Sequence, residues 1–269
     1  MTYDGHKGTD IRLSSEAALR RDPPGIRAAA PGTVIGTRDE MPDQLLNTPG
    51  APGPDEIAGR ECGNGVVIRH DGGWQTQYCH MARGSIAVSP GDEVATGTLL
   101  GRMGESGATE FPHLHFSLRH DGAVVDPFAP PPEAACGTEQ DTLWADPPAY
   151  RPGGLLAAGT LDRVPDYAEI RRGLPPRPQA PRKDPALVLW AFGYGARAGD
   201  AIRFVLEGPE GDVFDRTVLL DKTQAQVFRA FGRRTPPDGW TSGGYRARID
   251  WRRDGEVIDS LEVPLVLTD

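Results

Sequence analysis

One alternating segment, residues 111–118 with the sequence FPHLHFSL, limits the folds open to this chain more than any other stretch. Successive side chains of a β-strand point to opposite faces, so His113, His115 and Ser117 share one face and three apolar residues share the other. Burial of the apolar face fixes the strand register, because a slip of one residue would bury both histidines. Two imidazoles on one strand face can bind a metal ion, or a metal ion and its substrate. A solvated face that carries two histidines is the alternative.

The composition favours a β-rich chain with more than one compact unit. A length of 269 residues is enough for one large domain or two ordinary ones. The 34 glycines and 26 prolines favour turns and short strands over long helices. We therefore expect a mainly β fold.

The charge balance excludes several classes of partner. There are 29 basic and 38 acidic side chains, for a net charge of −9, whereas a nucleic-acid-binding surface needs a basic footprint. No polybasic patch is present for anionic lipid, and no apolar run reaches the roughly 20 residues of a membrane span. A signal peptide is not visible either, because Met1 is followed at once by polar residues.

The cysteines suggest an oxidising compartment. Cys62 and Cys79 lie at roughly matching distances from an Asp-Gly-Gly turn at residues 71–73, which joins two runs of strand-like sequence. A disulfide between them is plausible and would imply an oxidising environment. Two buried free thiols are the alternative. Cys136 is left unpaired, as it would be if its partner lay upstream of Met1.

The distribution of strand-like and proline-rich sequence divides the chain into three segments. We expect a first domain over residues 1–130 and a proline-rich linker over residues 131–185. Residues 186–269 are expected to form a small Ig-like β-sandwich, because strand-like runs recur there at short intervals between Gly, Pro and Asp turns. These runs are residues 187–192, 201–206, 226–231 and 245–251. The segment contains no histidine or cysteine, so no obvious metal site.

Two of the six histidines are interpreted as turn residues. His70 and His120 each stand in an Arg-His-Asp-Gly sequence where a hairpin turn is expected. Of the others, His80 is expected on the same strand face as Thr76 and Tyr78. His6 lies four residues before Asp10, in a glycine-containing turn from which both side chains can converge. The polar residues 38–61 are expected to form an exposed loop that lines a site.

Three motifs, His6-x-x-x-Asp10, Gln77-Tyr78-Cys79-His80-Met81 and His113-Leu114-His115, resemble in order and spacing the lysostaphin/LytM-type zinc metallopeptidases. These enzymes cleave peptide bonds in bacterial peptidoglycan. Residues 63–68 and 91–94 also look like that family, and the similarity covers roughly residues 5–128. The resemblance implies a LytM-type antiparallel β-sheet peptidase domain, peptidoglycan peptides as partners, and a periplasmic or extracellular location that also suits a Cys62–Cys79 disulfide.

Carried over residue by residue, the resemblance makes His6, Asp10 and His115 ligands of Zn²⁺ and makes His80 and His113 catalytic. Three protein ligands leave a fourth zinc position open for water, whose pKa falls from about 15.7 toward about 7. His113 is interpreted as the general base, and His80 as the residue that orients the water or stabilises the oxyanion. Family members carry groove-forming strands ahead of the first histidine, so we expect the natural chain to extend beyond Met1.

Three other functions compete with this one. A non-catalytic relative would bind wall peptides or activate another hydrolase, but such proteins typically lack one or more of the five residues. A non-haem iron oxygenase also uses two histidines and a carboxylate. Its usual first motif is His-x-Asp/Glu, which does not match His6-x-x-x-Asp10. The glycine-rich residues 90–101 resemble biotinyl or lipoyl carrier hairpins. Those hairpins need a lysine at the tip, and no lysine lies between Lys7 and Lys183.

Overall fold

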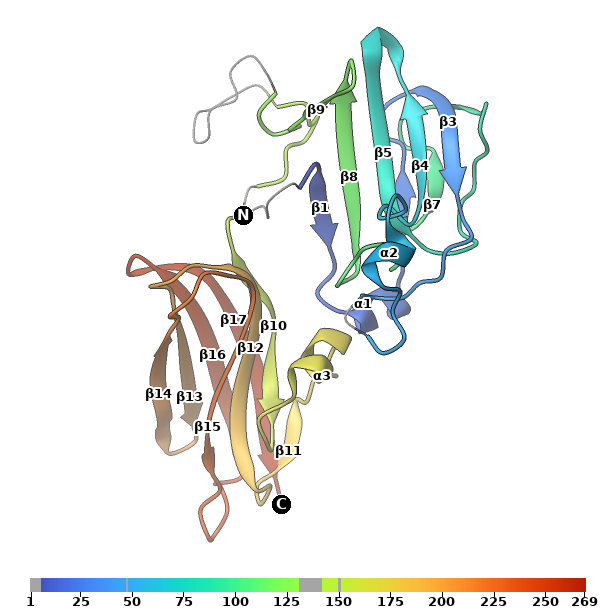
Figure 1. Cartoon of the computed structure of the whole chain (residues 1–269). Helices are drawn as coiled ribbons and strands as arrows, with labels where there is room; N and C mark the ends of the chain where they lie inside the picture. Colours follow the sequence, from blue (N-terminus) through green and yellow to red (C-terminus); the bar gives the residue numbers. More distant parts are fainter. Residues whose placement is uncertain (1–5, 47, 131–141, 150) are drawn as a thin grey trace. The chain divides into compact units, whose positions relative to one another are not determined.

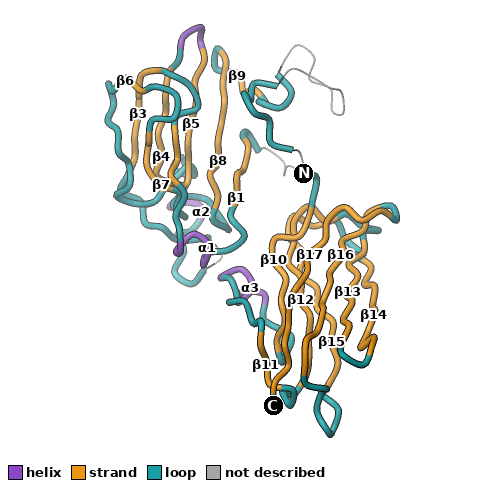
Figure 2. The backbone as a smooth tube through the Cα atoms, turned by 180° about the vertical axis from the view of Figure 1, so that it is seen from behind, coloured by secondary structure: helices purple, strands orange, loops and turns teal. Residues whose placement is uncertain are grey.

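The computed structural model describes residues 6–46, 48–130, 142–149 and 151–269, and its contacts divide the chain after Ala149 into two compact units. Strands dominate both units, and the few helices are short (Figures 1 and 2). This confirms the expectation of a mainly β chain. Within the described residues no helix has the length and apolar character needed to cross a membrane.

The first unit is built on a seven-stranded antiparallel sheet (Figure 1). Its order is β1-β8-β5-β4-β3-β6, and β9 pairs with β8. A separate pair, β2 with β7, and three short helices complete the unit. The bounds are β1 Thr9–Arg12, α1 Glu16–Arg21, β2 Gly25–Arg27, β3 Gly32–Arg38, α2 Pro54–Ile57, β4 Asn64–Arg69, η1 Asp71–Gly73, β5 Trp74–Met81, β6 Glu93–Val94, β7 Leu99–Arg102, β8 His113–His120 and β9 Ala123–Val125.

The alternating segment 111–118 forms most of β8 and places its apolar face as expected. Leu114, Phe116 and Leu118 are all buried in one hydrophobic cluster with Tyr78 of the neighbouring strand. The strand begins at His113, directly after a proline that has no backbone N–H to donate to a ladder. Because the apolar residues fix which face is inside, His113 and His115 lie together on the other face.

The hairpin β4–β5 brings the two flanking cysteines together. The strands pair in register around the turn η1, and Cys62 and Cys79 form a disulfide across a sequence separation of 17 residues. Gly72 and Gly73 have positive φ values of 66° and 82°, which supply the left-handed backbone of the turn. The predicted pairing is present, whereas Cys136 lies outside the described residues.

Reduction of the Cys62–Cys79 disulfide should destabilise the first unit by about 3 kcal/mol, the loop-closure value for a loop of this length. Calorimetry with and without a reductant should show one transition moving to lower temperature. The second unit contains no cysteine, so its transition is the internal control. A shift of both transitions, or of neither, would contradict the expected effect.

The second unit is a sandwich of two sheets. One has the order β10-β12-β15 and the other β11-β17-β16-β13-β14. A single hydrophobic cluster takes residues from both, including Leu189 of β12, Phe204 of β13 and Ile249 of β16. The bounds are β10 Gly154–Leu161, α3 Tyr167–Arg172, β11 Gln179–Pro181, β12 Ala186–Ala196, β13 Ala201–Gly208, β14 Gly211–Leu219, β15 Gln224–Arg234, β16 Gly243–Arg253 and β17 Glu256–Thr268. All four strands predicted from the sequence are present, as β12, β13, β15 and β16.

The prediction of a linker over residues 131–185 is wrong for its second half. β10 pairs with β12 along its whole length, and β11 pairs in parallel with β17. β10 is rich in Gly and Ala rather than β-branched residues, and β11 ends in a proline, which an edge strand tolerates. These segments therefore lack strand propensity and are ordered by pairing with strands distant in the sequence. Residues 131–141 lie outside the described part of the chain.

Candidate metal centre

β8 lies between β1 and β5, and these three strands gather the candidate residues. Asp10 of β1 and Cys79 of β5 both stand opposite His115, and Arg12 stands opposite His113. Directly paired residues of antiparallel strands share a sheet face, so Asp10 and His115 meet although 105 residues separate them in the sequence.

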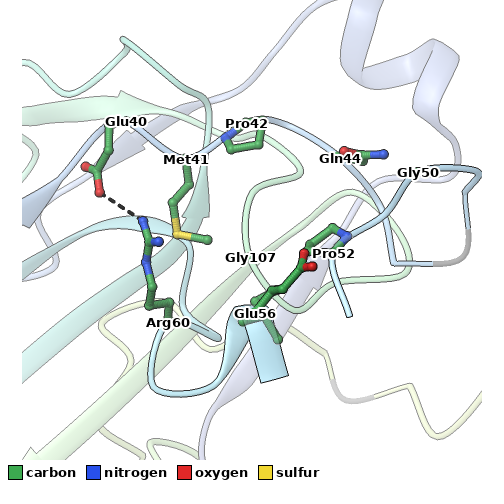
Figure 3. A pocket seen from close by; sticks show the side chains of 10 residues that line it. Glu40, Met41, Pro42, Gln44, Gly50, Pro52, Glu56, Arg60 and Gly107 are labelled. Carbon is green, nitrogen blue, oxygen red and sulfur yellow. Dashed lines mark hydrogen bonds and ion pairs between the residues drawn. The ribbon is translucent and has the colours of Figure 1, made fainter. Parts of the chain in front are cut away.

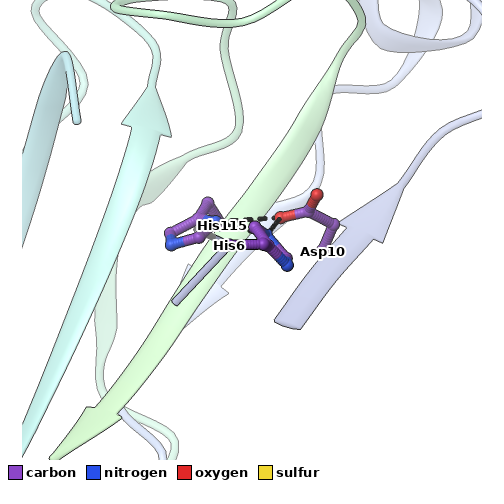
Figure 4. Close-up of side chains that lie close together, drawn as sticks. All are labelled: His6, Asp10 and His115. Atoms are coloured by element: carbon purple, nitrogen blue, oxygen red, sulfur yellow. Dashed lines mark hydrogen bonds and ion pairs between the residues drawn. The ribbon is translucent and has the colours of Figure 1, made fainter. Parts of the chain in front are cut away.

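His6, Asp10 and His115 bring one ligand atom each to a common point (Figure 4). Oδ1 of Asp10 lies 3.0 Å from Nε2 of His6 and 2.9 Å from Nδ1 of His115. The two histidine nitrogens are 3.2 Å apart, and all three ligand atoms lie within 4.8 Å of one another. Two imidazole nitrogens and one carboxylate oxygen form a donor set that suits zinc. The structure thus brings together the three residues predicted as ligands.

Asp10 is ionised at neutral pH although its carboxyl group is half-buried. Burial by itself raises the pKa of this carboxyl group, but the short polar contact with His115 and the electrostatic attraction of His113, His6 and His115 outweigh burial and lower the pKa to about 2. A half-buried carboxylate surrounded by imidazole nitrogens is an arrangement in which a divalent cation would compensate the negative charge.

His80 and His113 lie beside this group with their ring centroids 4.6 Å apart. Nδ1 of His80 is 2.8 Å from the carbonyl oxygen of Ser106, and Nδ1 of His113 is 2.9 Å from that of Phe111. A carbonyl oxygen only accepts hydrogen bonds, so in each neutral ring Nδ1 carries the hydrogen and Nε2 keeps its lone pair. Nε2 of His113 is 3.4 Å from Oδ1 of Asp10, so its lone pair faces the candidate metal position.

Both of these histidines are neutral at pH 7. Burial lowers the pKa of His80 to about 3, with the neighbouring His113 acting in the same direction. Burial also lowers the pKa of His113, although the Asp10 carboxylate opposes the shift. A neutral imidazole with a lone pair on Nε2 accepts a proton or a hydrogen bond, which is the property required of a general base.

The face predicted for His80 is wrong. Strict alternation along β5 places His80 with Thr76 and Tyr78, yet Tyr78 is buried in the hydrophobic core while the ring of His80 lies against His113. His80 has a φ of 61°, in the left-handed region, and the ladder between β4 and β5 contains a register shift nearby. This local break in the pleat turns His80 toward the site.

The residues that orient the histidines include some that sequence reasoning missed. The carbonyl of Ser106 holds His80, while Thr109 Oγ1 lies 3.1 Å from Nδ1 of His113. Both stand between β7 and β8, where no periodicity marks a function. His70 and His120 lie outside the cluster, as expected, although His120 is the last residue of β8 rather than a turn residue. His70 contacts the carbonyl of Pro31, and His120 stacks on Trp74 at 4.3 Å.

The long segment 38–61 is more ordered than the predicted exposed loop, because it contains α2 and the buried residues Met41, Leu45 and Ile57. With Gly107 it lines a cavity of about 410 Å³, and Glu40 and Arg60 form an ion pair of 3.2 Å in the lining (Figure 3).

Hydrogen bonds connect Met41, which lines the cavity, through Asn64 to Ser106, whose carbonyl holds His80. Asn64 accepts from the backbone N–H of Met41 and donates its own N–H to Ser106 Oγ.

Comparisons with known proteins agree on this first unit. Residues 4–127 match the family model described as Peptidase family M23. Protease LasA of Pseudomonas aeruginosa is 41% identical over 68 residues, which are 22% of this chain and 16% of that protein. Peptidoglycan DD-endopeptidase ShyA of Vibrio cholerae is 33% identical over 120 residues, or 43% of this chain and 26% of that protein.

Among solved structures, a point mutant of the catalytic domain of the prophage-encoded M23 protein EnpA from Enterococcus faecalis is 25% identical, with a TM-score of 0.33. It matches 47% of this chain and 79% of that one. The chain spans about a quarter or less of the length of the two curated relatives.

Proposed function

We propose, from the match of residues 4–127 to the model of Peptidase family M23, that the chain is a zinc-dependent endopeptidase that hydrolyses peptide bonds of bacterial peptidoglycan with an activated water. One observation carries the proposal. His6, Asp10 and His115 converge on one point, and two neutral histidines, His80 and His113, lie beside them.

The residues fit a catalytic zinc rather than a structural one. Three protein ligands, two nitrogens and one oxygen, leave a fourth position for water or substrate. When bound, zinc would lower the pKa of a water and polarise the scissile carbonyl group. His6, Asp10 and His115 would hold the ion, and the ionised Asp10 would supply the negative charge.

His113 is the proposed general base. Its Nε2 lone pair faces the ligand atoms at 3.4 Å from Asp10 Oδ1, and its Nδ1–H is bound to the carbonyl of Phe111. In this orientation His113 accepts the proton of the attacking water at Nε2 and afterwards donates it to the leaving amine.

His80 is proposed to orient the water. Its Nδ1–H is bound to Ser106, so the neutral ring offers only an acceptor at Nε2. An acceptor orients a water O–H, whereas stabilising an oxyanion requires a donor. The first of the two roles considered for His80 is therefore the one that its hydrogen bonding supports.

The substrate and the location are proposed from the relatives and from the disulfide. ShyA is named a peptidoglycan DD-endopeptidase, and Mpg of Neisseria gonorrhoeae, 38% identical over 74 residues, is named a DD-carboxypeptidase/endopeptidase. The Cys62–Cys79 disulfide suits an oxidising compartment. We propose a periplasmic or extracellular location, where peptidoglycan is found.

The proposal is tested by removing the metal and restoring it. Purified chain is stripped with a chelator and incubated with isolated peptidoglycan sacculi and with defined muropeptides. Stripped protein should release no peptide fragments, and one equivalent of Zn²⁺ should restore cleavage. Zinc-loaded protein that binds sacculi but cuts neither substrate would contradict the proposal and indicate the non-catalytic alternative. Restoration by Fe²⁺ alone, with oxygen consumption, would indicate the oxygenase.

A further inference from the structure

We propose that Ser117 is a positioning residue for His115, because it links the ring of His115 to the carbonyl of Lys7 and so directs Nδ1 toward the metal. The inference rests on the proposed zinc site, and it assigns a function to the third polar residue on the polar face of the alternating segment.

We call the chain of hydrogen bonds from His115 through Ser117 to the carbonyl of Lys7 the relay, and the donor of each bond in it can be assigned. Ser117 Oγ donates its single hydrogen to the carbonyl oxygen of Lys7, at 2.8 Å. The same oxygen lies 3.1 Å from Nε2 of His115 and has only lone pairs left, so Nε2 must be the donor. A neutral ring with its hydrogen on Nε2 has its lone pair on Nδ1, the atom that faces Asp10 and His6. The relay thus selects the tautomer that a metal ligand needs.

The relay also selects one orientation of the ring. Rotating the imidazole by half a turn would direct Cε1–H at Ser117 and Cδ2–H at Asp10, and both polar contacts would be lost. Ser117 is only 2% exposed, so water cannot readily take its place. The ring edge is packed against Gly8, where an added Cβ would lie 2.7 Å from Nε2 of His115. Close packing on one side and a directed hydrogen bond on the other hold the ring in place.

Chain connectivity makes this contact cooperative. Lys7 and Gly8 lie between His6 and Asp10, so the segment that supplies two ligands also fixes the third. Loss of the Ser117 hydroxyl should therefore loosen His115 and the backbone next to His6 together. Partners of this kind, which orient a ligating histidine through its other nitrogen, typically change metal affinity by about 10- to 100-fold.

The test measures zinc affinity rather than activity. The full chain and its Ser117→Ala variant are titrated with Zn²⁺ in competition with a chromophoric chelator. Thr76→Val is the matched control, because Thr76 Oγ1 is equally buried in the same sheet and bonds Nε2 of a histidine outside the site, His70, at 2.8 Å. We expect Ser117→Ala to weaken zinc binding by about 10- to 100-fold, Ser117→Thr, which keeps the hydroxyl, to recover part of the loss, and Thr76→Val to bind as the parent does.

The outcomes separate this inference from the proposed function. Equal affinity of the parent and Ser117→Ala would overturn the relay, as would an equal loss in Ser117→Ala and Thr76→Val. Thermal unfolding of the metal-free proteins identifies a purely structural effect, which would lower the unfolding temperature of Ser117→Ala without a selective loss of zinc. A parent chain that takes up no zinc would instead contradict the proposed function.

Discussion

Replacing His115 with alanine should abolish zinc binding and lower kcat/KM for peptidoglycan cleavage by more than about 10³-fold, on the order of 4 kcal/mol of transition-state stabilisation. The substitution removes one of the three proposed ligands and leaves the half-buried Asp10 carboxylate without its shortest polar contact, 2.9 Å from Oδ1 to Nδ1 of His115. Two remaining ligands hold zinc weakly, and the activated water depends on the metal. Metal content after gel filtration and muropeptide release measure the two effects.

His120→Ala is the matched control for this substitution. His120 ends the same strand, but its ring stacks on Trp74 and its side chain is 43% exposed. Its removal should leave zinc content and cleavage unchanged. If His115→Ala retained stoichiometric zinc and full cleavage, the assignment of His115 as a ligand would be wrong.

The alternating segment explains why much of the first unit was predictable. The period of two in residues 113–118 directly determines which side chains are inside, and the structure buries the apolar three. The disulfide was predictable for a related reason, since a two-stranded hairpin places residues at equal distances from its turn side by side. These are local consequences of strand geometry.

The meeting of the three proposed ligands does not follow from local strand geometry. Asp10 reaches His115 because β1 pairs with β8 across more than 100 residues, and no periodicity specifies that register. Only the resemblance of three motifs to a known family predicted the grouping. The orientation of His80 was not predictable by alternation, because it depends on a single left-handed φ. A backbone conformation of this kind is held by the surrounding structure and leaves no composition signal.

The second unit shows the same limit. β12, β13, β15 and β16 are apolar enough to be recognised individually. The centre of β10, by contrast, consists of two alanines and one glycine, at residues 157–159. β10 is a strand because its backbone bonds to β12 and because Leu156 and Leu161 pack against the cluster of Ile170, Trp190 and Phe192. Propensity is a weak guide where such tertiary contacts decide the conformation.

His113→Ala separates catalysis from metal binding. We expect this variant to keep its zinc, because His113 is not one of the three residues proposed as ligands. Its kcat should nevertheless fall by about 10²- to 10⁴-fold, the usual contribution of a general base. The lone pair that accepts the proton is lost, while His6, Asp10 and His115 are left in place. KM should change little, because the interaction removed is one made in the transition state.

His80→Ala is the comparison that distinguishes the roles proposed for His80 and His113. The ring centroid of His80 lies 6.0 Å from that of His115, and its proposed role is to orient the water that His113 deprotonates. Its removal should lower kcat by less than the removal of His113. Loss of zinc in His113→Ala would make His113 a ligand instead of a base, and a larger loss of kcat in His80→Ala would exchange the two roles. Metal analysis combined with steady-state rates on one defined muropeptide distinguishes these results. Loss of a metal ligand lowers both the zinc content and kcat, whereas loss of a general base lowers kcat alone.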